Sequence, residues 1–201
     1  MANSIRGGRA SAWASQAMVI AIAAGTSSSV LAACVTETAE IDFSGNTYDY
    51  TFSSVLEGAE QDVREVVTDY EHLARINPNI VESRVVERYS PTSLKRLLRL
   101  ERCILMVCFD LNFVEHVEES ARVITTTIIP QESNFRDGVA EWILESLPGN
   151  RTRIHLRATQ TPDFWIPPLI GPLILKRVFA HDVNETCANI QRLVALPGAS
   201  S

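Results

Sequence analysis

The chain has 201 residues, of which 46% are hydrophobic and 21% charged, and its formal net charge is −6. This composition is typical of one globular domain with short extensions, and the acidic balance argues against a nucleic-acid-binding protein, which usually presents a basic face. The four cysteines and four histidines show no zinc-binding spacing, so we predict no metal site. Glycine-rich phosphate loops and common hydrolase motifs are absent from the sequence, so we predict no cofactor and assign no catalytic residue.

Residues 1–33 have the pattern of an export signal. Arg6 and Arg9 lie in a segment without acidic residues, an apolar run follows at 17–24, and small residues precede Cys34. The apolar run is shorter than the roughly 20 residues that a membrane-spanning helix requires. We therefore expect a signal peptide over residues 1–33.

The end of this segment, Leu-Ala-Ala-Cys at 31–34, is similar to a bacterial lipobox. By that resemblance Cys34 would carry lipid and tether the chain to a membrane, and Val35 behind it favours the outer membrane over the inner one. The expected location is then the bacterial periplasm. A secreted chain cleaved after Ala33 and an uncleaved tail are the alternatives. Against export, an odd number of cysteines remains without Cys34, which is unusual in an oxidising compartment.

The first part of the mature chain contains a predicted tether, a strand and a helix. Residues 34–46 are polar and acidic, which favours a tether. Aromatic and polar residues alternate over 48–53, which predicts a strand. Apolar residues then recur at helical spacing over 59–75, and the Asn-Pro-Asn sequence at 77–79 ends this helix.

A long series of strands follows. Their polar faces indicate an antiparallel sheet with one side in water. The predicted strands cover 80–89, 94–117 (broken once near Arg102), 122–129, 139–145 and 151–160.

Two cysteines fall within the second of these runs. Cys103 and Cys108 would be roughly 16 Å apart along a single strand, beyond the ~7 Å between Cα atoms that a disulfide tolerates. They would also point to opposite faces. We interpret them as small apolar residues that fill space in the sheet.

The last element is a long helix from Gly171 to about Leu196, followed by a disordered tail at 197–201. A sheet with one dry face must cover that face, and this helix is the only large apolar partner available. The predicted domain, residues 47–196, is therefore α+β with a helix-grip architecture. In it a curved antiparallel sheet of about seven strands surrounds a long C-terminal helix, with a tunnel between them.

Three segments carry a resemblance to a known family. They are 66–85, with Asp-Tyr, Leu, Pro and Ser-Arg-Val in order, 135–144, with Phe-Arg-Asp and Trp, and the aromatic and proline-rich 162–168. The chain resembles the START-like (SRPBCC) superfamily, in its polyketide cyclase/dehydrase and coenzyme Q-binding branch. The resemblance implies that lipids, quinones, sterols or polyketides bind in the tunnel. It transfers no catalytic residue.

The candidate site is the lining of this tunnel. An apolar pocket with few polar groups is typical of ligand sites, although each of these residues taken alone could equally be core. Asp182 lies beside the buried stripe of the last helix, where it could bind a ligand head group or pair with an arginine. The candidate residues are Tyr50, Phe52, Phe109, Leu111, Phe113, Trp142, Leu144, Leu156, Phe164, Trp165, Phe179, Asp182, Val183 and Ile190.

Three functions follow as hypotheses. The first is binding, and carriage, of a hydrophobic small molecule by a chain anchored in a membrane through its N-terminal lipid. The second is a cyclase/dehydrase-type enzyme acting on a polyketide-like substrate. The third is a module of the cell envelope that binds another protein. The sequence leaves the oligomeric state open.

Overall fold

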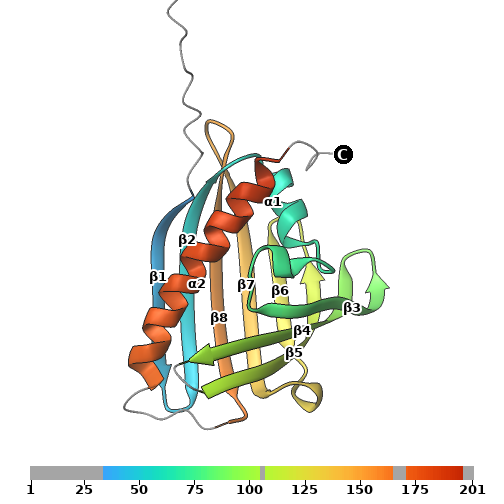
Figure 1. Ribbon diagram of the computed structural model, residues 1–201. Helices are drawn as coiled ribbons and strands as arrows, with labels where there is room; N and C mark the ends of the chain where they lie inside the picture. Colours follow the sequence, from blue (N-terminus) through green and yellow to red (C-terminus); the bar gives the residue numbers. More distant parts are fainter. Residues whose placement is uncertain (1–33, 105–106, 165–170, 197–201) are drawn as a thin grey trace, which may run out of the picture. The chain divides into compact units, whose positions relative to one another are not determined.

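The computed structural model describes residues 34–104, 107–164 and 171–196, which form an eight-stranded antiparallel sheet and one long helix (Figure 1). The predicted helix-grip fold is confirmed, with eight strands where about seven were expected. The elements are β1 (Val35–Ser44), β2 (Thr47–Glu57), α1 (Glu60–Val67), η1 (Leu73–Arg75), β3 (Ile80–Ser90), β4 (Ser93–Ile104), β5 (Val107–Glu119), β6 (Val123–Ile128), η2 (Pro130–Glu132), β7 (Phe135–Leu147), β8 (Arg151–Pro162) and α2 (Gly171–Val194).

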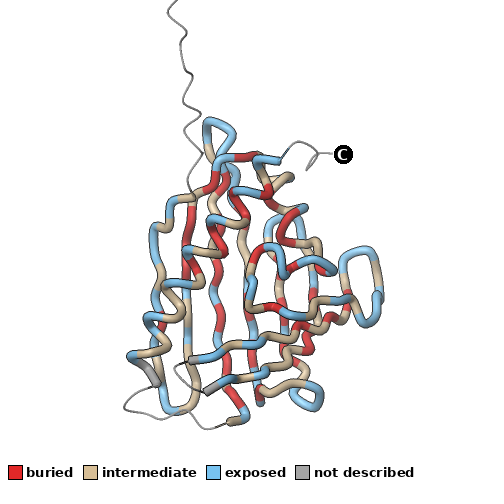
Figure 2. The backbone as a smooth tube through the Cα atoms, viewed as in Figure 1, coloured by how far each residue is buried: buried red, intermediate tan, exposed pale blue. Residues whose placement is uncertain are grey.

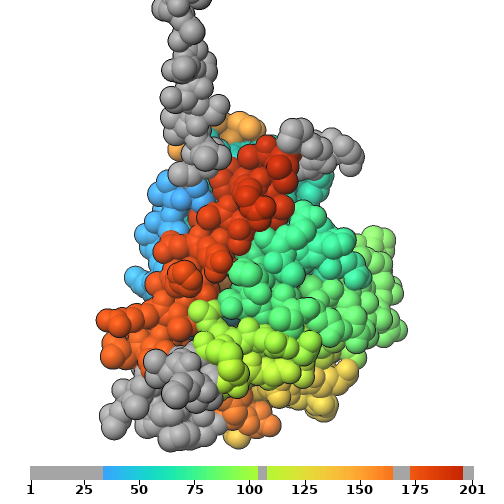
Figure 3. Space-filling model, in the orientation of Figure 1, coloured from blue at the N-terminus to red at the C-terminus, as the bar shows by residue number. Residues whose placement is uncertain are grey.

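The strands follow the order β1-β2-β8-β7-β6-β5-β4-β3, so the first hairpin pairs with the last strand. β4 and β5 cross the view at a steep angle to β1, β2 and β8, because the twist accumulates from strand to strand (Figure 1). The sheet thereby curves around α2, which lies across its concave face. Figure 3 shows α2 covering the sheet between β1 and the region of β3 to β5.

Helix α2 is amphipathic along its described length. Val183, Cys187 and Ile190 are buried against the sheet, whereas His181 and Arg192 are exposed. Figure 2 shows the same alternation of buried and exposed turns along the helix, and buried stretches in the strands beneath it. The apolar spacing of the last helix thus positions it over the sheet.

The helix predicted over 59–75 is divided into two pieces. α1 ends at Val67, and a single 3-10 turn, η1, follows at Leu73–Arg75. Val63 and Val66 of α1 are buried in the same core as Tyr70. The hydroxyl of Ser83 on β3 donates to the backbone oxygen of Tyr70, which holds the connecting segment against the sheet.

Residues 35–44, expected to belong to a tether, instead form the edge strand β1. Its register with β2 runs from Val35 opposite Val55 to Ser44 opposite Thr47, with one bulge. Ile41 is buried, and it lines the space under α2. The acidic residues between the inward-facing positions conceal the period-two pattern in the sequence, because an edge strand has one face in water.

The interpretation of Cys103 and Cys108 as unpaired residues is wrong. β4 ends at Ile104 and β5 begins at Val107, so the two cysteines lie directly opposite each other across a hairpin. Their Cα atoms are 3.9 Å apart and their side chains form a disulfide. The distance expected along one continuous strand does not apply to these cysteines, because the chain reverses direction between them. The reversal follows Ile104, whereas the sequence had placed the break near Arg102.

A second disulfide joins Cys34, at the start of β1, to Cys187 on α2, with 5.7 Å between their Cα atoms. The Cys34 sulfur in this bond cannot also carry a thioether-linked lipid, so each chain has one fate or the other. Lipidation of Cys34 therefore stays a prediction. The predicted signal peptide, 1–33, and the tail, 197–201, lie outside the described residues.

Candidate ligand cavity

A cavity of about 540 Å³ lies between the concave face of the sheet and α2. Its volume falls within the roughly 300–1,000 Å³ range of small-molecule sites. Most of its wall is aliphatic or aromatic, contributed by β2, β4, β5, β7, β8 and α2. Strands and a helix that are far apart in the sequence thus meet around one apolar space.

The structure places the predicted site residues in three groups. Leu144 and Ile190 are each 1% exposed and belong to the packed core, not to the cavity wall. Trp165 lies outside the described residues. The residues that line the cavity are Tyr50, Phe52, Phe109, Leu111, Phe113, Trp142, Leu156, Phe164, Phe179, Asp182 and Val183.

Aromatic rings pack against one another along the walls. The ring of Tyr50 meets that of Phe179 edge-on at 5.3 Å between centroids, which joins β2 to α2. Phe52 and Trp142 make a similar contact at 5.7 Å between β2 and β7. Such pairs add stability beyond the area that they bury, so these walls are held in place by packed rings.

One pair of opposite charges is built into the wall and is fully satisfied. Arg96 on β4 and Glu115 on β5 are direct cross-strand partners, and both side chains are less than 10% exposed. Arg96 Nε donates to Glu115 Oε2 at 2.8 Å, and Thr126 Oγ1 donates to Glu115 Oε1 at 3.1 Å. The Arg96 guanidinium also stacks over the ring of Tyr70. With its oxygens and its charge matched, this pair acts as part of the scaffold.

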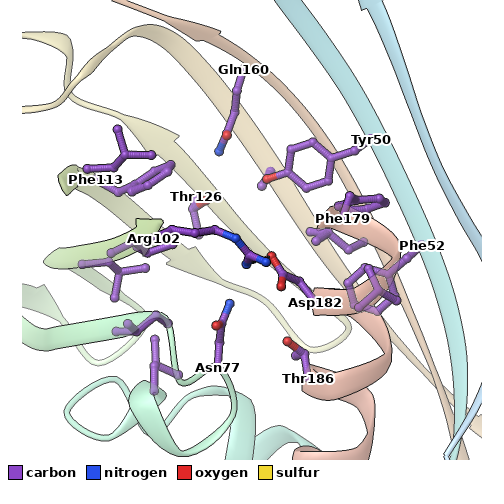
Figure 4. Close-up of a pocket in the computed structure, with 18 of the residues that line it drawn as sticks. Tyr50, Phe52, Asn77, Arg102, Phe113, Thr126, Gln160, Phe179, Asp182 and Thr186 are labelled. Carbon is purple, nitrogen blue, oxygen red and sulfur yellow. Dashed lines mark hydrogen bonds and ion pairs between the residues drawn. The ribbon is translucent and has the colours of Figure 1, made fainter. Parts of the chain in front are cut away.

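A second pair extends across the cavity from the sheet to the helix. Arg102 near the end of β4 donates through Nη1 to Asp182 Oδ2 on α2 (Figure 4). Both side chains are 23% exposed. The other oxygen of the same carboxylate, Asp182 Oδ1, is buried and has no hydrogen-bond partner among the described residues.

Neutral polar groups lie at the opposite wall. Tyr48 donates through its hydroxyl to Gln160 Oε1 at 3.1 Å, and Gln160 extends into the cavity (Figure 4). Burial raises the pKa of Tyr48 and Tyr50 well above the usual range, so both phenols are uncharged at every physiological pH. The cavity therefore offers a few fixed polar groups on an otherwise apolar surface.

The predicted site did not include either of the two arginines that line the cavity, Arg96 and Arg102. The period-two pattern of β4 is the sequence signal that could have placed these arginines on the inner face of the sheet. Arg96 and Arg102 occupy the same parity as Leu94, Leu98 and Leu100, so they must point to the same face. Glu115 likewise shares the parity of Leu111 and Phe113 on β5, and only its pairing with Arg96 requires the strand register.

The described residues contain no group of three metal-binding side chains. Within them no helix is both long and apolar enough to cross a bilayer. The described cavity therefore combines an apolar wall, two matched charge pairs, and one carboxylate oxygen that is free to accept a hydrogen bond.

Comparison with known families gives one match that covers most of the chain. A family model described as polyketide cyclase/dehydrase and lipid transport matches residues 32–195. This range includes every described strand and α2. A search among curated proteins finds no matching sequence.

Solved structures share the fold at low sequence identity. The Zhui aromatase/cyclase from Streptomyces superposes with a TM-score of 0.61 and 16% identity, over 76% of this chain and 98% of that one. The lipid transfer and protein localization domain of human StarD13 gives 0.57 and 13%, over 80% and 90%. A STAR-related lipid transfer protein from Xanthomonas axonopodis gives 0.54 and 15%, over 77% and 98%. These likenesses establish a START-like fold.

Proposed function

We propose, since the chain belongs to the polyketide cyclase/dehydrase and lipid transport family, that it binds one hydrophobic small molecule between its sheet and α2. The ligand would be a lipid, a quinone or a polyketide-like compound, and the protein would hold or carry it. The observation that carries this proposal is the cavity of about 540 Å³ with aromatic and aliphatic walls. An empty apolar space of this size would be costly in a domain built only as a scaffold.

Two of the similar structures are described as lipid transfer proteins or domains. Their likeness supports carriage as the role. A protein that only binds its ligand needs no reactive polar group in the cavity. The Arg96–Glu115 pair, whose charges and hydrogen bonds are matched, is consistent with a cavity wall that takes no part in a reaction.

The second candidate is a cyclase/dehydrase-type enzyme. A specific observation favours it: the Asp182 carboxylate has a free oxygen inside the cavity, where it could accept a proton. The similar aromatase/cyclase supports the same interpretation. The two candidates differ in one observable, because a carrier returns its ligand unchanged whereas an enzyme does not.

We also propose that the chain acts in an oxidising compartment after export. The two disulfides support this, since such bonds persist outside the cytosol. In an exported chain whose Cys34 is unmodified they also remove the objection raised by an odd cysteine count, because all four cysteines are then paired. The mass of the mature protein tests the proposal. Export without an anchor predicts an unmodified chain that contains both disulfides, whereas a lipoprotein predicts acyl chains on Cys34 and a free Cys187 thiol.

Identification of the bound molecule tests the main proposal. The full chain is purified without detergent from a bacterial host and unfolded in organic solvent, and the extract is analysed by mass spectrometry. We expect one hydrophobic species at about one molecule per chain. As a control, ligand-free protein exposed to a total lipid extract should take up the same species. Recovery of no lipid in either experiment would contradict the proposal, and recovery of a converted product would favour the enzyme.

A further inference from the structure

The unpartnered oxygen of Asp182 distinguishes one position inside the cavity from the rest of its wall. Asp182 Oδ1 is the one buried side-chain nitrogen or oxygen without a hydrogen-bond partner among the described residues. A buried carboxylate oxygen that accepts no hydrogen bond is unfavourable by an amount comparable to a lost charged hydrogen bond. The carboxylate of Asp182 is also fixed in place, because its other oxygen, Oδ2, accepts a hydrogen bond from Arg102 across the cavity.

The surroundings of this oxygen form a small polar patch in an apolar space. Thr186 follows Asp182 by one helical turn, and in Figure 4 its side chain and that of Asn77 extend toward the ion pair. Asn77 Oδ1 accepts two bonds from Asn79, at 3.0 Å from the backbone nitrogen and 3.0 Å from the side-chain nitrogen. All these residues line the same cavity, apart from Asn79. One end of a bound molecule would therefore meet polar groups, while the rest would meet carbon.

The charges of the cavity restrict what that polar end can be. The charged side chains of the described lining are Arg96, Arg102, Glu115 and Asp182. They form two matched pairs, so their sum is zero. A charged head group would be buried without a counter-charge, and a carboxylate would lie beside the Asp182 carboxylate. A neutral head group carries neither cost.

We propose that the ligand is a neutral amphiphile whose polar end carries a hydrogen-bond donor, such as a hydroxyl group, and that this group donates to Asp182 Oδ1. The inference rests on the proposed function, since it names the ligand class of the same cavity. Asp182 is then the residue that selects alcohols over ethers and over carboxylic acids of the same length. A carboxylate oxygen accepts strongly, so we expect the donor to improve affinity by about tenfold.

The test is a competition experiment on the full oxidised chain. N-phenylnaphthylamine, an uncharged apolar fluorophore, is bound first and then displaced by tetradecanol, by its methyl ether or by tetradecanoate. We expect tetradecanol to compete about tenfold better than either of the others. The ether removes the donor, and the acid brings a negative charge.

Variants assign the preference to the carboxylate. In Asp182→Asn the advantage of tetradecanol over the ether should fall to less than about threefold, and tetradecanoate should gain because Arg102 loses its partner charge. Glu185→Gln on the same helix is the matched control, since Glu185 pairs with the exposed His181 outside the cavity, and it should keep the full preference. If Asp182→Asn does not fold, the double variant Arg102→Leu/Asp182→Leu removes both charges together. It should bind tetradecanol and its ether alike, and tetradecanoate more weakly because the charge of the acid then has no partner.

The outcomes separate this inference from the proposed function. Binding of the fluorophore with equal competition by alcohol and ether would overturn the Asp182 inference and leave the cavity as a binding site. Tighter binding of tetradecanoate than tetradecanol would also overturn it, in favour of an anionic head group held by Arg102. Failure of the fluorophore and of all three compounds to bind would overturn the proposed function as well.

Discussion

The side-chain amide of Gln191 makes a two-way hydrogen bond with the backbone of Glu57. Glu57 N donates to Gln191 Oε1 at 2.8 Å, and Gln191 Nε2 donates to Glu57 O at 2.9 Å. Helix α2 thereby completes the edge of β2 where that strand ends. This contact therefore holds the C-terminal part of α2 against the end of β2.

Replacement of this amide should destabilise the protein. Gln191→Leu leaves both backbone groups of Glu57 without their partners and should lower the free energy of unfolding by about 2 kcal/mol. Gln191→Glu keeps an acceptor for Glu57 N but buries a carboxylate whose second oxygen faces the oxygen Glu57 O, so it should destabilise the protein at least as much. Urea unfolding measures both, with Arg192→Ala on the exposed face as the control, which should change stability by less than about 0.5 kcal/mol. Equal stability of the Leu variant and the wild type would contradict the pinning role.

Gly58, between β2 and α1, is required for close packing of α2. Its φ is +149°, and a Cβ atom there would clash with Val194 Cγ1. Gly58→Ala should therefore cost roughly 2 kcal/mol or more, and Val194→Ala in the same chain should recover part of that loss. Gly45→Ala is the matched control, because Gly45 has φ +63° but open space around it, and we expect only about 1 kcal/mol. If both glycine variants lose the same amount, the contact with Val194 has no energetic role. Thermal unfolding followed by circular dichroism measures the series.

The two disulfides should differ in what they contribute. Cys34 and Cys187 are 153 residues apart in the sequence, whereas Cys103 and Cys108 are 5 apart. Loop-closure entropy predicts a loss of about 5 kcal/mol without the long-range bond and about 2 kcal/mol without the hairpin bond. Denaturant unfolding of the two double Cys→Ser variants tests this order. A larger loss for the hairpin variant would contradict the loop-closure argument.

A carboxylate on the outer face of the sheet should make the free energy of unfolding depend on pH in the acidic range. Glu37 on β1 accepts from Arg153 on β8 and Ser53 on β2, and these hydrogen bonds lower the pKa of Glu37 below its ordinary value of 4.5. A carboxylate with a depressed folded-state pKa stabilises the protein above its unfolded pKa, and that contribution is lost as the pH falls through the folded value.

Glu37→Gln should therefore be less stable than the wild type at pH 7, and the difference should shrink below about pH 4. Glu40→Gln, an exposed position on the same strand, controls for the loss of one negative charge. The measurement is the free energy of unfolding at a series of pH values from neutral down to about pH 3. A stability difference between Glu37→Gln and the wild type that stays constant over this range would contradict the assignment.

The periodic parts of the fold could be predicted from the sequence, because each follows from one face being dry. The alternation in β7 and β8 and the helical spacing of α2 together indicate the helix-grip architecture. β1 was missed because its inward positions, such as Ile41, are separated by acidic residues that an edge strand presents to water. The disulfide of Cys103 was missed because the position of a hairpin turn decides which residues face each other, and the run of strand-forming residues does not mark it.

The candidate site divides in the same way. Aromatic residues such as Phe52 and Trp142 could be placed on the inner face from periodicity alone. Three-dimensional packing decides which inward-facing apolar residues line the cavity and which belong to the packed core. The sequence therefore could not show that Leu144 belongs to the core. The partner of Asp182 could not be predicted either, because Arg102 reaches it across the cavity from a strand 80 residues away in sequence.

The central claim is that a hydrophobic ligand binds inside the cavity. A bulky side chain introduced on the inner face of β7, compared with one on its outer face, tests this claim most directly. Ala140 on β7 lines the cavity, whereas its neighbour Val139 is 42% exposed on the opposite face. The measurement is a calorimetric titration of tetradecanol into the wild type, Ala140→Phe and Val139→Phe. We predict one site per chain in the wild type and in Val139→Phe, and a loss of affinity of about tenfold or more in Ala140→Phe. Equal affinities in all three proteins, or no saturable binding to any, would contradict the account.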